Sequence, residues 1–130
     1  MPIAHAPVVV GVDGTTHGDA ALKFALDDAT RHGAELEAIT AWGSGHMTED
    51  QANLVQAASL ARVLSGRHHL PTIRARVIHG AAGPVLVEAA RHSRLLVVGS
   101  RSGSSRVNSV SSYCTTHFSG PLTIVPDLAG

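Results

Sequence analysis

The sequence predicts an α/β fold in which strands and helices alternate along the chain. Four short runs of β-branched and aliphatic residues are each followed by a Gly-containing turn and then by a segment whose apolar residues have helical spacing. Hydrophobic residues make up 44% of the chain and aromatic residues only 3%, so the core must consist of Ala, Val, Leu and Ile. Such side chains suit helices packed on a parallel sheet. We therefore expect one domain over residues 1–130, a doubly wound open sheet of five parallel strands with helices on both faces.

The first half of the chain contains two strands and two helices by these criteria. Residues 8–12 (VVVGV) form a β-branched run, and residues 17–32 have the apolar spacing of a helix. Residues 34–42 are predicted as the second strand. The sequence TEDQ at 48–51 fits a capping box, with a hydroxyl at the cap and an amide three residues later. It predicts a second helix that ends near residues 65–66.

The second half continues the alternation. Residues 72–79 alternate between apolar and polar, with two arginines on the outer face, which is typical of a half-exposed edge strand. A helix is expected at Gly83–Pro84, because proline is favoured in a first helical turn. Residues 95–98 read as a buried strand, a further helix begins near Asn108, and residues 122–125 form the last strand.

The charge balance and the length of the apolar runs exclude some classes of protein. Ten acidic and ten basic residues cancel, so the chain lacks the basic face that nucleic-acid binding requires. No apolar run approaches the ~20 residues of a membrane span. The first residues, MPIAHAP, contain neither the basic region nor the apolar core of a signal peptide. We expect a soluble cytoplasmic protein that binds no nucleic acid and no membrane.

Cysteine and histidine suggest no reactive or metal site. The single cysteine, Cys114, has no partner for an internal disulfide, and we expect both Cys114 and His117 to be packing residues. The nine histidines are scattered, and no H-E-x-x-H or Cys/His ligand spacing occurs. A metal site is not predicted.

The stretch 95–111 is the strongest candidate for a binding site. A strand, a loop of Gly, Ser and Arg, and a helix N-terminus follow one another there, and this order suits an anion such as phosphate. Arg101 and Arg106 could add charge-assisted hydrogen bonds. The alternative is that the stretch is only a βα connection rich in small polar residues.

Asp13 is the second candidate. It follows the first strand, at the edge where open α/β sheets bind ligands. Thr15 and Thr16 after it are possible caps of the next helix. The alternative is that Asp13 is itself a turn or capping residue.

The sequence contains no complete catalytic motif. Walker A is absent, since Gly-Lys-Ser/Thr occurs nowhere. Residues 99–103 (GSRSG) place Arg rather than Ser at the centre of a nucleophile-elbow pattern. We expect no enzyme, or at most slow ATP hydrolysis.

Three segments in register resemble the universal stress protein family. They are VVVGVDGT (8–15), LLVVGSR (95–101) and NSVSSYCTTHFSGPLTIVP (108–126). The resemblance implies a Rossmann-like fold of the adenine nucleotide α-hydrolase type and a stress-response or regulatory role. It also implies a homodimer joined through the last strand, Leu122–Val125, and, in one branch of the family, a site for ATP with Mg²⁺.

The resemblance also implies a set of binding residues. It places Asp13 at the ribose, Ala41 beside the adenine, and Val98 and Gly99 along the nucleotide. Thr15, Arg101, Ser102, Gly103, Asn108, Ser109, Val110 and Ser111 complete the implied set, with Arg101, Ser109, Val110 and Ser111 near the phosphates.

This chain departs from the ATP-binding pattern G-x2-G-x9-G-[ST]. Ser102 stands at the second glycine, with Gly103 directly after it, and Asn108 stands at the third. Five residues separate Ser102 from Asn108, where the pattern has nine. Two functions therefore stay open: a module that binds an adenine nucleotide, and a relative that binds none and acts as an interaction module.

Overall fold

The computed structural model describes residues 6–43, 47–100 and 110–126, which form one five-stranded sheet with four helices. All strands are parallel, in the order β3-β2-β1-β4-β5. The strands are β1 (Val8–Gly11), β2 (Leu36–Gly43), β3 (Ile73–Gly80), β4 (Leu95–Gly99) and β5 (Leu122–Val125). The helices are α1 (Thr16–His32), α2 (Glu49–Leu64), α3 (Ala82–Ala89) and α4 (Val110–His117). The predicted doubly wound α/β fold is confirmed.

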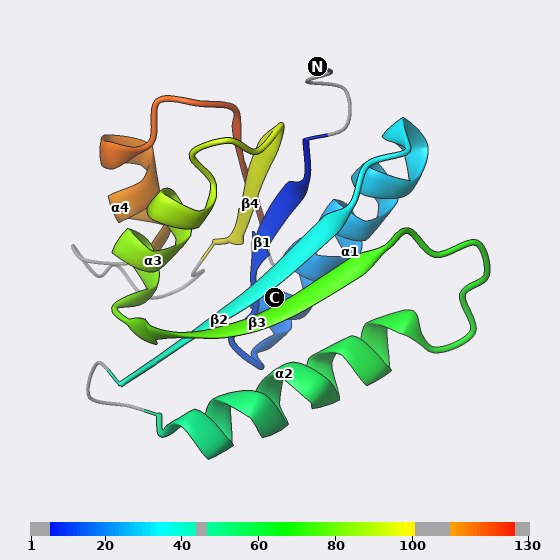
Figure 1. Ribbon diagram of the computed structural model, residues 1–130, viewed down its shortest axis with the longest axis horizontal. Coiled ribbons are helices and arrows are strands. Elements are labelled where there is room, and N and C mark those ends of the chain that lie inside the picture. The colour runs from blue at the N-terminus through cyan, green and yellow to red at the C-terminus, as the bar shows by residue number, and fades with distance from the viewer. Residues whose placement is uncertain (1–5, 44–46, 101–109, 127–130) are drawn as a thin grey trace.

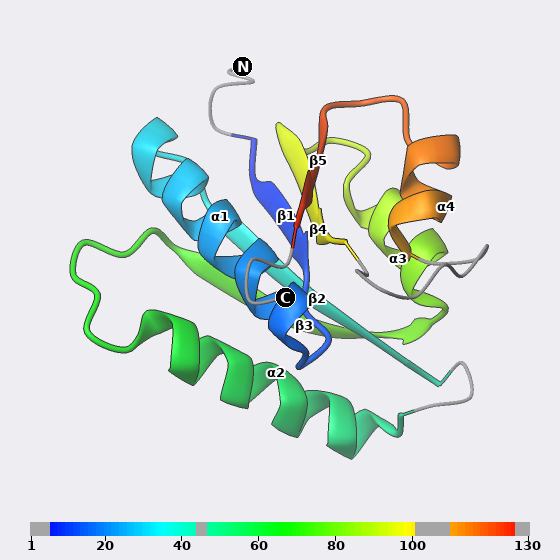
Figure 2. The ribbon, with the colours of Figure 1, turned by 180° about the vertical axis from the view of Figure 1, so that it is seen from behind.

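The helices cover both faces of the sheet. The first two, α1 and α2, pack on one face, and α1 lies behind the strands in Figure 1 and in front of them in Figure 2. The other two pack on the opposite face, α3 against β1, β2 and β3, and α4 against β4 and β5. This division follows from right-handed crossovers that first run outward from β1 to β3 and then return to the other side of β1.

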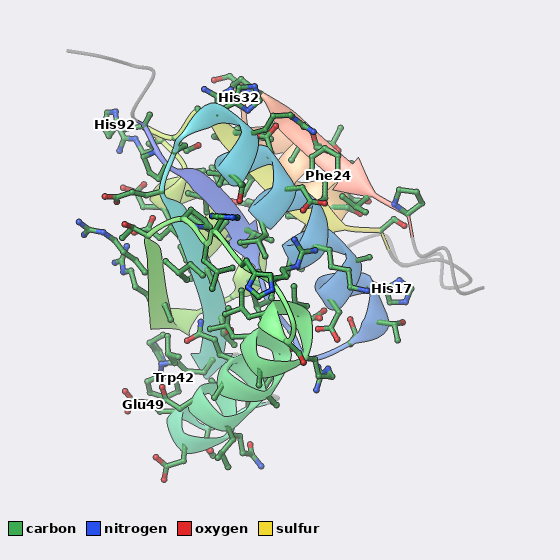
Figure 3. All side chains as sticks on the ribbon, turned by 90° about the vertical axis from the view of Figure 1, so that its right-hand side faces the viewer. His17, Phe24, His32, Trp42, Glu49 and His92 are labelled. Atoms are coloured by element: carbon green, nitrogen blue, oxygen red, sulfur yellow. The ribbon has the colours of Figure 1, made fainter. Side chains whose placement is uncertain are left out.

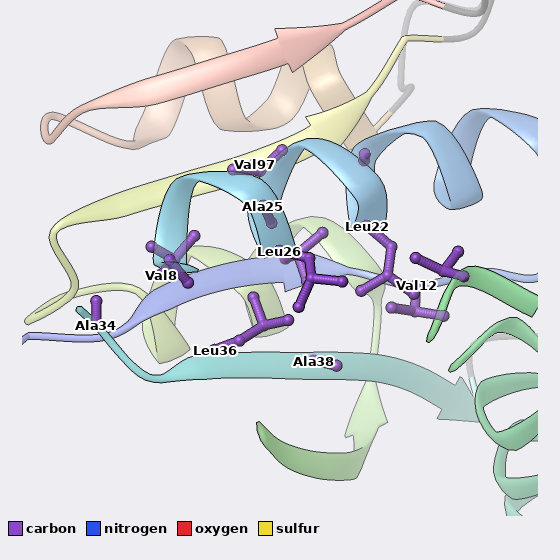
Figure 4. Packing of buried hydrophobic residues seen from close by; sticks show 13 residues of the cluster. Val8, Val12, Leu22, Ala25, Leu26, Ala34, Leu36, Ala38 and Val97 are labelled. Atoms are coloured by element: carbon purple, nitrogen blue, oxygen red, sulfur yellow. The ribbon is translucent and has the colours of Figure 1, made fainter. Parts of the chain in front are cut away.

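Each face has its own apolar core of small aliphatic side chains. On the α1 side, Leu22 and Leu26 are fully buried against Val8 and Leu36, and Figure 4 shows them between the helix and the strands. On the other face, Val9, Leu96 and Cys114 belong to the second cluster. Because the core contains almost no aromatic rings, helices and sheet approach each other through Ala and Val, as the composition predicts.

The helix starts follow the predicted capping residues, with one shift. Thr48 accepts a hydrogen bond from the Gln51 N–H at 3.2 Å, and the Gln51 side chain accepts one from the Thr48 N–H at 2.9 Å, which confirms the capping box. The third helix begins at Ala82, before the predicted Gly83–Pro84. Proline fits there because the first-turn N–H groups need no helical acceptor.

The two edges of the sheet are β3 and β5. The outward arginines of β3 pair with glutamates around β2: Arg74 Nε lies 3.2 Å from Glu35, and Arg76 Nη1 lies 3.3 Å from Glu37. The prediction of a half-exposed edge strand at residues 72–79 is therefore confirmed.

The described residues contain neither a membrane-spanning helix nor a cluster of metal-ligating side chains. Within residues 6–43, 47–100 and 110–126, no helix has the length and apolar character needed to cross a membrane. In the same residues, no group of three or more His, Cys, Asp or Glu side chains could hold a metal ion.

Candidate functional site

The sheet order places a crevice at the carboxyl ends of β1 and β4. The chain leaves β1 toward β2 by way of α1 on one face, and it reaches β4 from α3 on the opposite face. The two helices therefore diverge at this point, and open α/β sheets bind ligands at such a reversal of strand order.

A cavity of about 90 Å³ lies in this crevice. This is several times the roughly 10–15 Å³ that one water molecule needs, so it is more than a packing gap. Its walls come from the ends of β1, β2 and β4 and from the first turns of α1, α3 and α4. They are formed by Gly11, Val12, Asp13, His17, Gly18, Ile39, Thr40, Ala41, Met47, Ala82, Leu86, Val98, Gly99 and Val110.

Five of the predicted binding residues line this cavity, although they are up to about a hundred positions apart in the sequence: Asp13, Ala41, Val98, Gly99 and Val110. Thr15 and Ser111 are described but are not among the lining residues. The remaining predictions, Arg101, Ser102, Gly103, Asn108 and Ser109, lie outside the described residues, as does Arg106.

Asp13 both shapes the turn into α1 and lines the cavity. Its Oδ1 atom accepts hydrogen bonds from the Thr15 N–H at 3.0 Å and from the Thr15 hydroxyl at 2.6 Å. The same hydroxyl caps α1 by accepting the Gly18 N–H at 3.1 Å. The structure thus shows Asp13 as a turn residue, and its position on the cavity wall keeps the alternative of a site residue open.

Two glycines allow the backbone to approach closely around Asp13. A Cβ atom on Gly18 would overlap Asp13 Oδ1, and one on Gly99 would overlap the carbonyl of His17. The end of β4 therefore lies directly against the first turn of α1. A side chain at Gly99 would push β4 away from α1, whereas one at Gly18 would displace the Asp13 carboxylate.

Ala41 presents backbone groups rather than a side chain. The Val12 N–H donates to the Ile39 carbonyl at 2.9 Å, which shows that Ile39 faces β1. Backbone groups of a strand alternate in direction, so the N–H and C=O of Ala41 point to the same side as those of Ile39. They lie beyond the last pairing of β1 with β2, at Gly11 and Ile39, and so face the crevice.

Nine lining residues were not predicted, among them Ile39, Met47, Leu86 and His17. Ile39 and Leu86 follow strand and helix periodicity, and that pattern predicts only a core position. Met47 precedes a capping box, where an apolar residue is expected to pack against the helix. These residues line the cavity only because the folded chain brings them together, so no local sequence signal could have identified them as lining residues.

The comparison with protein families agrees with this architecture. The model of the universal stress protein family matches residues 5–126. The chain belongs to the universal stress protein family.

Among curated relatives of this family member, a universal stress protein of Mycobacterium tuberculosis is 36% identical over 110 residues, which are 74% of this chain and 35% of the relative. A second one from the same organism is 35% identical over 105 residues, covering 74% of this chain and 36% of the relative. The chain spans about a third of the length of these relatives.

Solved structures of the family match over almost the whole chain. A universal stress protein in complex with cAMP has a TM-score of 0.80 and 26% identity, and the match covers 95% of this chain and 98% of that one. A universal stress protein from Archaeoglobus fulgidus in complex with dAMP has a TM-score of 0.73 and 17% identity, with 94% and 98% covered. At that identity the second comparison shows the fold alone.

Proposed function

We propose that this universal stress protein binds an adenine nucleotide in the cavity at the ends of β1 and β4. The observation that carries the proposal is the pair of backbone groups of Ala41, which face the same cavity as the Asp13 carboxylate. An adenine ring presents a hydrogen-bond acceptor at N1 beside a donor at its 6-amino group. A backbone N–H and C=O of one residue are the matching donor and acceptor.

The remaining walls suit the rest of such a ligand. Ile39, Leu86 and Val98 are apolar and would cover the faces of the base. The Asp13 carboxylate would accept a ribose hydroxyl, a role that acidic residues take in related sheets. Val110 and Ser111 stand in the first turn of α4, the end of a helix at which the helix dipole favours a phosphate group. The family member solved with cAMP supports this class of ligand.

Calorimetric titration with AMP, cAMP and ATP with Mg²⁺ tests the proposal. We expect saturable binding of at least one of the three, and binding at least tenfold weaker for Asp13→Ala, because a hydrogen bond to a charged group contributes about 1.5–3 kcal/mol. Asp50→Ala, in the first turn of α2 away from the cavity, is the matched control and should bind like the wild type. No heat at millimolar concentrations of all three ligands would favour the module that binds no nucleotide.

Tryptophan fluorescence gives an independent readout of the same binding. Trp42 is the only tryptophan and directly follows Ala41. Its ring lies edge-on to His79 with centroids 4.7 Å apart, and Figure 3 shows it at the end of the sheet where α2 begins. A ligand bound at Ala41 should therefore change the emission, with the same midpoint as the calorimetric titration.

We also propose that the protein is a homodimer joined through Leu122–Val125. The support is that β5 ends the sheet and that its Ile124 is 39% exposed. An apolar edge strand is prone to pairing with another chain unless something covers it. Sedimentation should give a dimer mass for the wild type and for Leu54→Asp, an exposed control on α2, and a monomer for Ile124→Asp. A monomer mass for the wild type at all concentrations would exclude this interface.

The cytoplasm is the proposed location of the protein. Fractionation of cells that express the tagged chain should recover it with cytoplasmic markers. Recovery with membranes or in the medium would exclude this location.

A further inference from the structure

The hydrogen-bond ladder between β1 and β2 ends in an unusual way. In a parallel ladder, each β1 residue that faces β2 donates its N–H to one β2 carbonyl and accepts at its own C=O from the N–H two positions later in β2. Val12 donates to the Ile39 carbonyl at 2.9 Å, so the next bond in the series would join the Ala41 N–H to the Val12 carbonyl. No such bond is formed between these two described residues.

A side chain takes the place of that N–H. The Thr40 hydroxyl donates to the Val12 carbonyl at 2.8 Å, and Thr40 is almost completely buried, with 1% of its surface exposed. The Val12 carbonyl is thus satisfied without Ala41. A buried carbonyl without a hydrogen bond is energetically costly, so an unpaired Val12 carbonyl would favour a bond from the Ala41 N–H. The bond from Thr40 removes this cost.

Gln56 of α2 holds the hydroxyl in this direction. Its Nε2 atom lies 2.8 Å from the Arg76 carbonyl, 3.1 Å from the Ala38 carbonyl and 3.2 Å from Thr40 Oγ1. Carbonyl oxygens only accept hydrogen bonds, so the nitrogen and not the oxygen of the Gln56 amide must face this group. Thr40 Oγ1 therefore accepts a hydrogen bond from the Gln56 amide and donates its own hydrogen bond to the Val12 carbonyl.

We propose that Thr40 is a positioning residue that keeps the Ala41 N–H open for N1 of an adenine base, and that Gln56 orients it. The choice of ligand rests on the proposed function, whereas the open N–H does not. Both side chains act on the Ala41 N–H through the carbonyl of Val12 and not through a hydrogen bond to the base. The device gives the site its preference for adenine over a base whose N1 carries a proton.

Amide hydrogen exchange of the ligand-free protein tests the first part without any ligand. We expect the Ala41 N–H to exchange much faster than that of Ile39 in the wild type and in Thr40→Ser, which keeps the hydroxyl. In Thr40→Val the freed Val12 carbonyl accepts from Ala41, so the Ala41 N–H should become protected. Protection of the Ala41 N–H in the ligand-free wild type would overturn the inference. This wild-type measurement remains valid even if one of the variants does not fold.

Binding of AMP and IMP tests the second part. Hypoxanthine carries a proton on N1 and so cannot accept from the Ala41 N–H. We expect Thr40→Val to bind AMP about tenfold more weakly, or about 1.4 kcal/mol, with little change for IMP. Thr40→Ser and Ser59→Ala should keep the wild-type preference, because Ser59 is a fully buried residue whose hydroxyl contacts Arg62 at 3.0 Å on another part of α2.

The two parts separate failure of the inference from failure of the proposed function. Equal loss for AMP and IMP in Thr40→Val, or the same loss in Ser59→Ala, would show a general loss of structure and overturn the inference. If the wild type binds neither nucleotide while Ala41 still exchanges rapidly, the proposed ligand is wrong and the open N–H is confirmed.

Discussion

At the scale of single residues, the proposed nucleotide site depends on how the Asp13 carboxylate is held. Thr15 engages Oδ1 through both its N–H and its hydroxyl, which orients the carboxylate before any ligand arrives. Such preorganisation reduces the entropy that binding has to overcome. Gly18 matters for the same reason, because its missing side chain is the space that Asp13 Oδ1 occupies.

Gly18→Ala should therefore separate binding from folding. The added methyl group displaces the Asp13 carboxylate, and we expect AMP affinity to fall about tenfold, the equivalent of one charged hydrogen bond. The stability of the helix should increase slightly, since alanine is favoured over glycine within helices by about 0.5–1 kcal/mol. Calorimetry and thermal unfolding of the same sample measure the two effects. Unchanged affinity would show that Asp13 can move without loss.

Cys114 behaves as a packing residue, as the sequence predicts. Burial raises the pKa of its thiol to about 11, from an ordinary value of 9.0. The folded protein then keeps the proton at pH values where the unfolded chain releases it, so the free energy of unfolding should decrease as the pH rises from 9 toward 11. Urea unfolding of the wild type and of Cys114→Ala below and within this range checks this. An identical pH dependence in both proteins would contradict it.

At the scale of elements, the ends of helices and strands decide where the site lies. Both α1 and α2 begin with a threonine whose hydroxyl accepts a backbone N–H. The ends of β1 and β4 carry the cavity, and Gly99 lets β4 reach the first turn of α1. The apolar faces of the helices only hold these ends in place.

The capping box of α2 should be worth a measurable part of the stability. Thr48→Ala removes the acceptor for the Gln51 N–H, and we expect a loss of about 1 kcal/mol in the free energy of unfolding. Thr48→Ser keeps the oxygen and is the control, with a much smaller change. Denaturant unfolding measures both. Equal losses would indicate that the methyl group and not the cap is responsible.

At the scale of the whole molecule, the strand order creates the cavity. No single segment contains the cavity. The ends of β1, β2 and β4 and the first turns of three helices meet there only because the strand order reverses beside β1. Ligand binding should therefore stabilise the complete fold and not one element.

Thermal unfolding should reflect this linkage. At an AMP concentration of 100 times the dissociation constant, we expect about 2.7 kcal/mol of added stability, because the ligand binds only the folded chain. At the same AMP concentration, the stability of Asp13→Ala should increase much less. A shift of equal size in that variant would place the ligand elsewhere.

The fold could be predicted from the amino-acid sequence because each element has a local signal. Hydrophobic periodicity identified the five strands and four helices that the described residues form, and the edge position of β3 followed from its outward arginines. The differences are small and occur at element ends. The first strand stops at Gly11 rather than Val12 because the Val12 carbonyl bonds to a side chain instead of to β2.

The walls of the cavity and the open N–H of Ala41 could not be predicted from the sequence, because both depend on contacts between distant segments. Asp13 and Gly99 could be named in advance because polar or glycine residues at the ends of buried strands are a local pattern. Val98 and Ala41 were named only through the resemblance to the family. Ile39, Leu86 and the pair Thr40 and Gln56 could not be named in advance, since each looks like an ordinary core or helix residue until the chain folds. Periodicity reports only whether a side chain faces inward. Which inward side chains meet depends on contacts between residues far apart in the chain.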